Sequence, residues 1–402
     1  MRQYWKIYML AAVSFLIGTS EYMIAGILDK VAEDVGVSLS AAGQLITAFS
    51  LAYALGTPIM MAITTRLNRR DLLLYSLGLI IVGNVLMVIL PGYGFMILAR
   101  VIMALGTGVF VVTSLTVASK LAAPNKQGGA IAIVLMGISA SLILGVPIGR
   151  IIAASYDWKL IFVGIALLSI IGLPVVARSI PPMEGDEPVP LSKQLAMVKR
   201  PRIALALAIT FFWILGYAIA FTYLSPYLLE VVGMNERWVS AALFAYGIAS
   251  LIGSKAGGFS TDRWGVARTL TGGMILNMVM LILLSAASGT GTFLVFSLLM
   301  LWSFFSWSSA PTQQYYLITL SPKASGIMLG LNTSVLQLAM AAGAGIGGVV
   351  IDNISLNAIT WIAASSIAVA AVTTAVMFRR IRSQSQSHHD NQQAEEISRI
   401  SA

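Results

Sequence analysis

The sequence of 402 residues contains no cysteine and only two histidines. Without cysteine it offers no disulfide, no thiol nucleophile and no thiolate metal site. Both histidines, His388 and His389, lie in a polar segment near the C-terminus, so the rest of the sequence has no imidazole base or ligand. It also has neither a Walker-type phosphate loop nor a His-Glu-x-x-His motif. These absences predict a protein that is not an enzyme and that holds no metal and no cofactor.

Charge is scarce as well. Charged residues make up 10% of the chain, whereas soluble proteins contain about 25%. Hydrophobic residues make up 58%, and the mean hydropathy is +0.87. A large soluble domain needs a polar surface and could not cover this much apolar material. The composition therefore predicts an integral membrane protein whose outer surface contacts the lipid bilayer.

Twelve apolar segments are candidate membrane spans, because a helix needs about 20 residues to cross the hydrocarbon core. They are 7–28, 40–63, 72–90, 95–118, 129–150, 159–178, 203–228, 238–257, 268–288, 292–316, 325–350 and 356–378. The fold is predicted to be all-α, with 12 transmembrane helices in two six-helix bundles, residues 1–178 and 203–378. A cytoplasmic linker (179–202) joins them, and a polar tail (379–402) is expected to be disordered.

The net charge of +9 is distributed unevenly along the chain. If both termini are cytoplasmic, most Lys and Arg residues fall on the cytoplasmic side, and four fall outside: Lys30, Arg150, Lys159 and Arg237. This asymmetry follows the positive-inside rule. It predicts a multi-pass protein of the inner (plasma) membrane with both termini in the cytoplasm. The basic charge is then a topological signal, and no nucleic-acid partner is expected.

A short basic loop occurs at the same place in each half of the chain. The second-half copy reads Gly258-x-x-x-Asp262-Arg263-x-Gly265-x-x-Arg268. The first-half copy, residues 65–70, reads Thr-Arg-Leu-Asn-Arg-Arg. Parallel repeats of six helices predict two bundles related by a pseudo-two-fold axis, which is the plan of one large class of transporters.

The second-half loop resembles the signature loop of the major facilitator superfamily. Its first-half counterpart has Thr65 where the family has an acid and Asn68 where it has a glycine. Arg100, in the stretch 98–106, resembles the motif of the family's fourth span. The resemblance implies a transporter in which two bundles give a central site access to each side of the membrane in turn.

Other stretches narrow the resemblance. Gly145-Val146-Pro147-Ile148-Gly149 is similar to the antiporter motif of the 12-helix drug/proton exporters. The stretches 21–28, 306–314 and 332–337 look most like bacterial purine-base efflux pumps and the related sugar-efflux-like exporters. The resemblance therefore implies export of a small solute in exchange for protons.

Two charged residues lie clearly inside predicted spans, Glu21 and Arg100. Buried charges are costly in a membrane, so each needs a partner or a role. Counted at 1.5 Å per residue, both lie roughly 8–10 Å below the predicted outer surface. In the superfamily fold their helices are neighbours, so a Glu21–Arg100 contact is expected. One hypothesis is proton coupling, since the charge and hydration around a carboxylate control its proton affinity. The other is a structural ion pair.

Aromatic and amide side chains gather on three predicted spans of the second half. Indole and phenol rings stack on flat heteroaromatic molecules, and amides read their edges. The predicted substrate-binding residues are Trp213, Tyr217, Trp307, Gln314, Asn332 and Gln337. The two tryptophans of span 10, Trp302 and Trp307, lie about 140° apart, so they are not expected to face one ligand. The alternative is that these side chains pack between helices or lie at the membrane interface.

The predicted gating residues are Gly145, Pro147, Gly149, Asp262, Arg263 and Arg268. The first three combine a Gly-x-x-x-Gly face with a proline, which permits close helix packing and bending. The last three carry charges that, by the resemblance, clamp the cytoplasmic gate. Close packing alone, or an ordinary solvated loop, would also explain them.

The function predicted from all of this is a proton-coupled secondary transporter that exports a small planar solute, a purine base or nucleoside-like molecule, as a monomer. Broad-specificity multidrug efflux is the alternative, and proton-coupled import remains open. A scaffold or receptor would not need two charges at matched depth inside the membrane.

Overall fold

The computed structural model describes residues 4–64, 66–123, 126–185, 196–287 and 291–400; within these ranges the side chains of residues 323, 325 and 380–400 are not described. Every regular element in these ranges is a helix. The first half contains α1 (Tyr4–Gly26), α2 (Leu28–Val35), α3 (Leu39–Thr64), α4 (Arg69–Ile89), α5 (Tyr93–Leu121), α6 (Gln127–Ala140), η1 (Ser141–Gly145), α7 (Val146–Ser155) and α8 (Lys159–Ser179). Because α6, η1 and α7 follow one another without a break, they form one membrane span.

The second half has the corresponding helices in the same order. They are α10 (Pro201–Thr222), α11 (Leu224–Pro226), η2 (Tyr227–Val231), α12 (Glu236–Ala286), α13 (Thr292–Leu320), η3 (Pro322–Ala324), α14 (Ser325–Asn353) and α15 (Ala358–Ile400). In the described part of the chain, 11 helices are long and apolar enough to cross a membrane.

The helix α12 accounts for the difference from the 12 predicted spans. It has 51 residues, about 77 Å of helix at 1.5 Å per residue, which is more than twice the thickness of the hydrocarbon core. At Gly265 the backbone leaves the helical region, with φ 80° and ψ 162°, a conformation that only glycine adopts without strain. The two arms of α12 are therefore two spans in succession. The loop expected over 258–267 is corrected to helix on both sides of this one residue.

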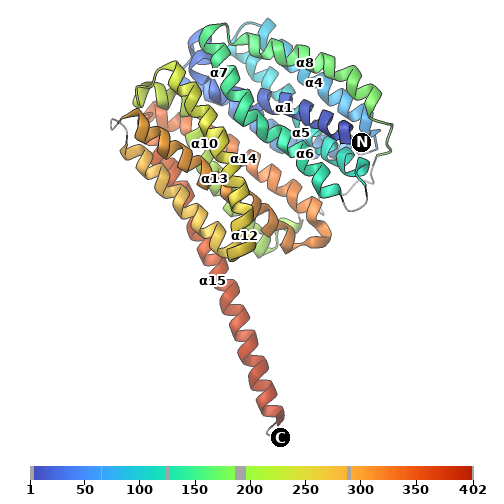
Figure 1. The fold of residues 1–402 in the computed structure, drawn as a ribbon, viewed down its shortest axis with the longest axis vertical. Helices are drawn as coiled ribbons and strands as arrows, with labels where there is room; N and C mark the ends of the chain where they lie inside the picture. The colour runs from blue at the N-terminus through green and yellow to red at the C-terminus, as the bar shows by residue number, and fades with distance from the viewer. Residues whose placement is uncertain (1–3, 65, 124–125, 186–195, 288–290, 401–402) are drawn as a thin grey trace.

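The helices form two bundles, α1–α8 in blue to green and α10–α15 in yellow to red (Figure 1). Within the first, α4 packs on α5 and α8, and α1 packs on α6; within the second, α12 packs on α13 and α15, and α10 packs on α14 and α15. Between the bundles, α3 packs on α14, and α7 packs on α12. Counted as spans, α3 is span 2 and corresponds to span 8, the first arm of α12, in the other half. The span that ends in α7 is span 5 and corresponds to span 11, α14. The two interfaces between the bundles are therefore equivalent. The predicted architecture of two six-helix bundles is confirmed.

The start of the predicted linker is fixed to the first bundle. The side chain of Asn68 caps α4 by accepting from the amide of Arg70 at 3.0 Å, and it also accepts from the amide of Met183 at 3.2 Å. The amide of Arg69 donates to the carbonyl of Met183 at 2.9 Å. The asparagine that stands in place of a glycine in the first-half loop therefore ties α4 to the residues after α8.

The C-terminal segment differs from its sequence prediction. Disorder was expected over 379–402, whereas α15 continues as helix to Ile400 and its second part projects away from the bundles (Figure 1). Residues 379–402 include four Arg and four Gln, which both have high helix propensity.

Candidate functional site

A cavity lies between the two bundles. The space inside it that is open to the centre of a water-sized sphere is about 90 Å³, several times the roughly 10–15 Å³ that a single water molecule needs. The walls come from α1 of the first bundle and from α10, α13 and α14 of the second. The lining residues are Glu21, Tyr22, Thr210, Trp213, Ile214, Tyr217, Ser306, Trp307, Ala310, Gln313, Gln314, Asn332, Leu336, Gln337 and Met340.

All six residues predicted to bind substrate line this cavity, and Glu21 lies with them. The second-bundle residues recur at intervals of three, four and seven along their helices. These intervals place side chains on one helix face, so each of α10, α13 and α14 presents one face to the cavity. The six are Trp213 and Tyr217 on α10, Trp307 and Gln314 on α13, and Asn332 and Gln337 on α14. A role for them in binding remains a prediction.

The two tryptophans of α13 have different surroundings. Trp307 lines the cavity, whereas Trp302 is fully buried in the core. The ring centroid of Tyr217 lies 5.9 Å from that of Trp307 and 6.1 Å from that of Trp302. Trp302 therefore packs near Tyr217 in the core, and of the two indoles only that of Trp307 lines the cavity, as the angle between them predicted.

A hydrogen-bonded cluster of polar side chains stabilises the second-bundle wall. Thr210 Oγ1 donates to Asn332 Oδ1 at 2.8 Å, and Gln313 Nε2 donates to Thr210 Oγ1 at 2.9 Å. The same Gln313 amide also donates to the carbonyl of Ala206 at 2.6 Å. Asn332 is thus held in place by its neighbour, which makes it a fixed part of the wall.

Two buried amide oxygens of the lining residues have no hydrogen-bond partner among the described residues. They belong to Gln313 and Gln337. Leaving such an atom unpaired costs about 1–3 kcal/mol. A ligand in the cavity that offered N–H donors would satisfy them.

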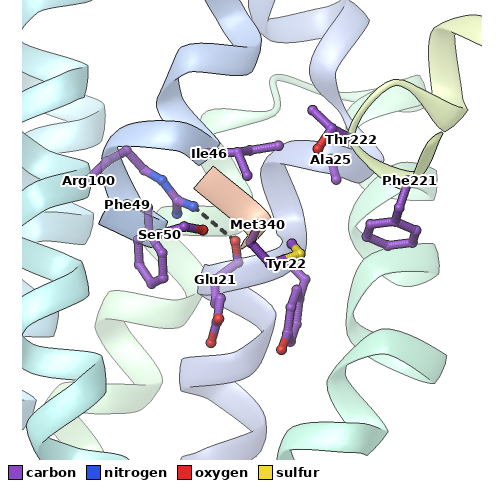
Figure 2. Close-up of a pocket in the computed structure, with 10 residues that line it drawn as sticks. All are labelled: Glu21, Tyr22, Ala25, Ile46, Phe49, Ser50, Arg100, Phe221, Thr222 and Met340. Atoms are coloured by element: carbon purple, nitrogen blue, oxygen red, sulfur yellow. Dashed lines mark hydrogen bonds between the residues drawn. The ribbon is translucent and has the colours of Figure 1, made fainter. Parts of the chain in front are cut away.

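The carboxylate of Glu21 turns away from Arg100 (Figure 2). Gln337 Nε2 donates to Glu21 Oε1 at 2.9 Å. This bond joins α1 of the first bundle to α14 of the second. Glu21 therefore contributes a carboxylate to a cavity whose other walls are aromatic rings and amides.

The predicted contact between Glu21 and Arg100 is formed through the backbone, and the ion pair of side chains is not. The buried guanidinium of Arg100 donates to the carbonyl of Ser20 at 2.8 Å, of Glu21 at 2.9 Å and of Leu45 at 3.3 Å (Figure 2 draws the bond to Glu21). Its Cζ also lies 4.2 Å from the ring centroid of Phe49. Because main-chain oxygens already engage the guanidinium, Arg100 ties α5 to α1 and α3.

Sequence reasoning missed several lining residues. Thr210 and Met340 lie three residues from the predicted Trp213 and Gln337, on the same helix faces. Helical spacing could therefore have identified them. Gln313, which directly precedes the predicted Gln314, also lines the cavity, so two neighbouring faces of α13 contribute to it.

The segment 145–149 packs against α1, as its glycines predicted. A Cβ on Gly145 would lie 2.2 Å from Thr19 Oγ1, and one on Gly149 would lie 2.2 Å from Met23 Cε. The π-helical turn η1 precedes Pro147, which lies in the first turn of α7. A role of Gly145, Pro147 and Gly149 in gating remains a prediction.

The charged signature residues are solvent-exposed. Asp262, Arg263 and Arg268 lie on either side of the break at Gly265. Within the described residues, no salt bridge involves any of the three. The predicted charge clamp is therefore absent from this conformation, and its role in another conformation remains a prediction.

Charged residues instead meet at the opposite end of the bundles, the end that contains α2 and the start of α12, here called the α2 end. The side chain of Arg150, fully buried, forms salt bridges with Asp29 of α2 and with Glu236 of α12, the latter at 2.5 Å. Lys30 also pairs with Glu236 at 2.7 Å. The two salt bridges of Glu236 cross between the bundles. The sequence analysis counted Arg150 and Lys30 only among the four basic residues on the outer side of the membrane.

Two hydroxyl groups add to this closure. Ser225 Oγ donates to the carbonyls of Ala25 and Gly26 at 3.2 and 3.1 Å, across the bundle interface. The side chain of Tyr223 enters a socket between α3 and α14. A Cβ on Gly43 would lie 2.1 Å from its hydroxyl, and one on Gly348 would lie 2.9 Å away.

The chain matches the family model described as Major Facilitator Superfamily over residues 10–344 and 238–401. A relative from Bacillus subtilis (strain 168), named "Uncharacterized MFS-type transporter YbcL", is 55% identical over 379 residues, which are 94% of this chain and 97% of the relative. The inner membrane transport protein YdhP of Escherichia coli (strain K12) is 29% identical over 343 residues, 85% of this chain and 88% of that protein.

Among solved structures, a bacterial homolog of the human lysosomal transporter Spinster, in an inward-facing and unoccupied conformation, is similar to this chain. The TM-score is 0.75 with 15% sequence identity, and the match covers 94% of this chain and 97% of that one. Identity this low shows the fold alone. The family match, the 55% identical relative and the two-bundle fold together show that this chain is a multi-pass membrane transporter that belongs to the Major Facilitator Superfamily.

Proposed function

We propose that this secondary transporter exports a small planar solute, a purine base or a nucleoside-like molecule, in exchange for protons. Glu21 is the proton carrier, and the substrate occupies the cavity lined by Trp307, Tyr217 and the amides. The protein lies in the inner (plasma) membrane as a monomer. Both termini are in the cytoplasm, so the α2 end faces outside.

One observation carries this proposal. A membrane-embedded carboxylate, Glu21, lines the same cavity as all six side chains that the sequence predicted for a planar solute. An ionisable residue at this depth is costly and marks a proton or substrate pathway. A proton and a solute that use one cavity influence each other directly, which is what coupled transport requires.

The chemistry of the cavity supports a planar, polar solute. The rings of Trp307 and Tyr217 offer apolar faces for stacking, and the unpaired amide oxygens of Gln313 and Gln337 accept N–H groups. A purine base has both a flat ring system and N–H groups on its edge.

Alternating access follows from the two ends of the molecule. The α2 end is closed by contacts between the bundles, including the Arg150–Glu236 salt bridge. Release of these contacts, and formation of a charge clamp by Asp262 and its arginines, would expose the same cavity to the other side.

The test uses purified protein in liposomes with an imposed pH gradient, and radiolabelled hypoxanthine as the probe. We expect Glu21→Gln to abolish flux driven by the gradient, while exchange of labelled for unlabelled hypoxanthine continues without a gradient. Glu230→Gln is the matched control, because Glu230 is an exposed carboxylate outside the cavity. Gradient-driven flux that is as fast in Glu21→Gln as in the wild type would refute the role of Glu21.

Broad multidrug efflux is the second candidate, and the apolar side chains of Leu336 and Met340 in the cavity favour it. Methionine adapts to ligands of different shape. Competition of hypoxanthine flux by purines but not by bulky hydrophobic cations would support the narrower function, and the reverse pattern would support multidrug efflux. The direction of hypoxanthine movement relative to the proton gradient distinguishes export from import.

A further inference from the structure

The hydrogen bond between Glu21 and Gln337 has a defined polarity. An ionised carboxylate has no donor, so the amide must present its Nε2 group, and Gln337 Nε2 lies 2.9 Å from Glu21 Oε1. The amide oxygen of Gln337 is then left without a partner among the described residues. Because the Gln337 side chain is 4% exposed, this oxygen is a buried acceptor beside the cavity that a ligand can satisfy.

A proton on Glu21 changes this arrangement. The protonated carboxyl group has an O–H that needs an acceptor. The unpaired oxygen of Gln337 is carried by the amide already bonded to that carboxyl group. A carboxylic acid and a primary amide pair through two hydrogen bonds, O–H to the amide oxygen and N–H to the carboxyl oxygen. Protonation of Glu21 therefore removes the Gln337 oxygen from the acceptors offered to a ligand.

Other titratable or charged side chains surround Glu21. Arg100 faces it from α5, Tyr53 from α3 and Tyr217 from α10, and Tyr22 follows it on α1. Arg100 donates to backbone carbonyls. Within the described residues, Gln337 is the side chain that hydrogen-bonds the Glu21 carboxylate. The new O–H therefore has its acceptor at Gln337.

We infer that Gln337 couples the proton to the solute, because the O–H of protonated Glu21 and an N–H of the planar solute compete for Gln337 Oε1. This inference rests on the proposed function and deepens it: the solute class is a planar molecule with at least two N–H donors. The solute binds fully when Glu21 is ionised and loses one hydrogen bond when Glu21 takes up a proton. Such exclusion produces exchange of one for the other.

Gln313 supplies the matched control within the same cavity. Its amide oxygen is also buried and unpaired. Its Nε2 group is fixed by the carbonyl of Ala206 and by Thr210, at 2.6 and 2.9 Å. Glu21 hydrogen-bonds Gln337 and not this amide. Gln313 therefore offers an acceptor that is independent of pH.

The experiment measures hypoxanthine affinity of the detergent-purified full chain across pH, for Gln337→Met and Gln313→Met. In the wild type we expect affinity to fall about tenfold as Glu21 protonates, the equivalent of one hydrogen bond. Gln337→Met should bind with the low affinity of the protonated wild type at every pH. Gln313→Met should bind more weakly than the wild type at every pH but keep the tenfold fall.

A pH dependence in Gln337→Met equal to that of the wild type would overturn the inference, since the solute would then contact Glu21 directly. Infrared difference spectra give a second readout that needs no solute. Acidification should shift the side-chain carbonyl band of one glutamine in the wild type and in Gln313→Met, but not in Gln337→Met or Glu21→Gln. Absence of this shift in the wild type also overturns the inference. Failure of hypoxanthine to bind the wild type at all would instead count against the proposed function.

Discussion

The two ends of this transporter differ in the charge contacts that their side chains make. At the α2 end, Arg150, Lys30 and Glu236 join the bundles through charge, and Tyr223 fills a glycine socket between α3 and α14. At the end that contains Gly265, the charges of Asp262 and its neighbours are exposed, and no salt bridge among the described residues includes them. In this conformation the α2 end therefore has its closing contacts, whereas the charged side chains near Gly265 make no salt bridge.

If the predicted charge clamp near Gly265 forms only in the other conformation, the conformational equilibrium depends on contacts that exist at one end at a time. A change at the α2 end should favour opening of that end, and a change near Gly265 should act in the opposite direction. Because the sequence lacks cysteine, the Ala25→Cys variant provides a unique labelling site near the closed α2 end. The rate of thiol labelling from outside, in that background, reports opening at the α2 end.

The largest effect is expected from Gly43→Leu. A Cβ at this position would lie 2.1 Å from the Tyr223 hydroxyl, so the α2 end could not close around the ring. Overpacking of this kind costs about 3 kcal/mol, which corresponds to roughly a 100-fold rise in labelling. Gly78→Leu is the control, since a Cβ there would meet no atom within 4 Å. Equal labelling of the two variants would show that the socket does not control opening.

A smaller effect in the same direction is expected from Arg150→Met. It leaves the carboxylates of Asp29 and Glu236 without their guanidinium. Because both carboxylates are partly exposed, we expect about 2 kcal/mol, or roughly 30-fold faster labelling, less than for a fully buried pair. Asp29→Asn removes only the salt bridge within the first bundle, so it should change labelling much less. If the two variants label alike, the salt bridge to Glu236 does not join the bundles functionally.

Asp262→Asn should act in the opposite direction and more weakly. Its carboxylate makes no salt bridge in this conformation, so the variant can only destabilise a state in which the charge clamp forms. An exposed pair contributes about 0–1 kcal/mol, so labelling should fall at most about fivefold. Faster labelling in Asp262→Asn would contradict a clamp at this end.

The smallest effect concerns Asp34, which lies at the α2 end but pairs within one bundle. The Lys159 ammonium, 2.8 Å away, lowers the pKa of Asp34 below its usual value of 3.8, and the Trp158 indole contributes. A lowered pKa means that the pair stabilises the fold at neutral pH and that this contribution is lost as pH falls through the folded-state pKa. The melting temperature of Asp34→Asn should therefore be slightly below that of the wild type at pH 7, with the gap closing below pH 3.8. Labelling should be unchanged, and a change would mean that pairs within a bundle also control opening.

The sequence predicted the spans and the cavity residues well, because both depend on local periodicity. Trp213 and Tyr217 are four residues apart, and so share a helix face wherever the helix is placed. The sequence identified the motif around Gly265 but predicted a loop there. Helix on both sides of one non-helical residue depends on how the two arms of α12 meet.

The contacts that the sequence did not predict depend on side-chain direction or on distant partners. Matched depth placed Arg100 beside Glu21, but depth does not determine whether a guanidinium binds a carboxylate or a backbone carbonyl. Arg150 and Glu236 meet across the bundle interface, and each has no local pattern that marks the other as its partner.

The three backbone bonds of Arg100 bear on how the molecule moves. They fasten α1 to α3 and α5, so α1 moves as part of the first bundle, while Gln337 moves with the second. Rocking of the bundles would then stretch the hydrogen bond between Glu21 and Gln337 in every turnover. An isotope label on the Gln337 amide would report this movement of the bundles without a labelled substrate.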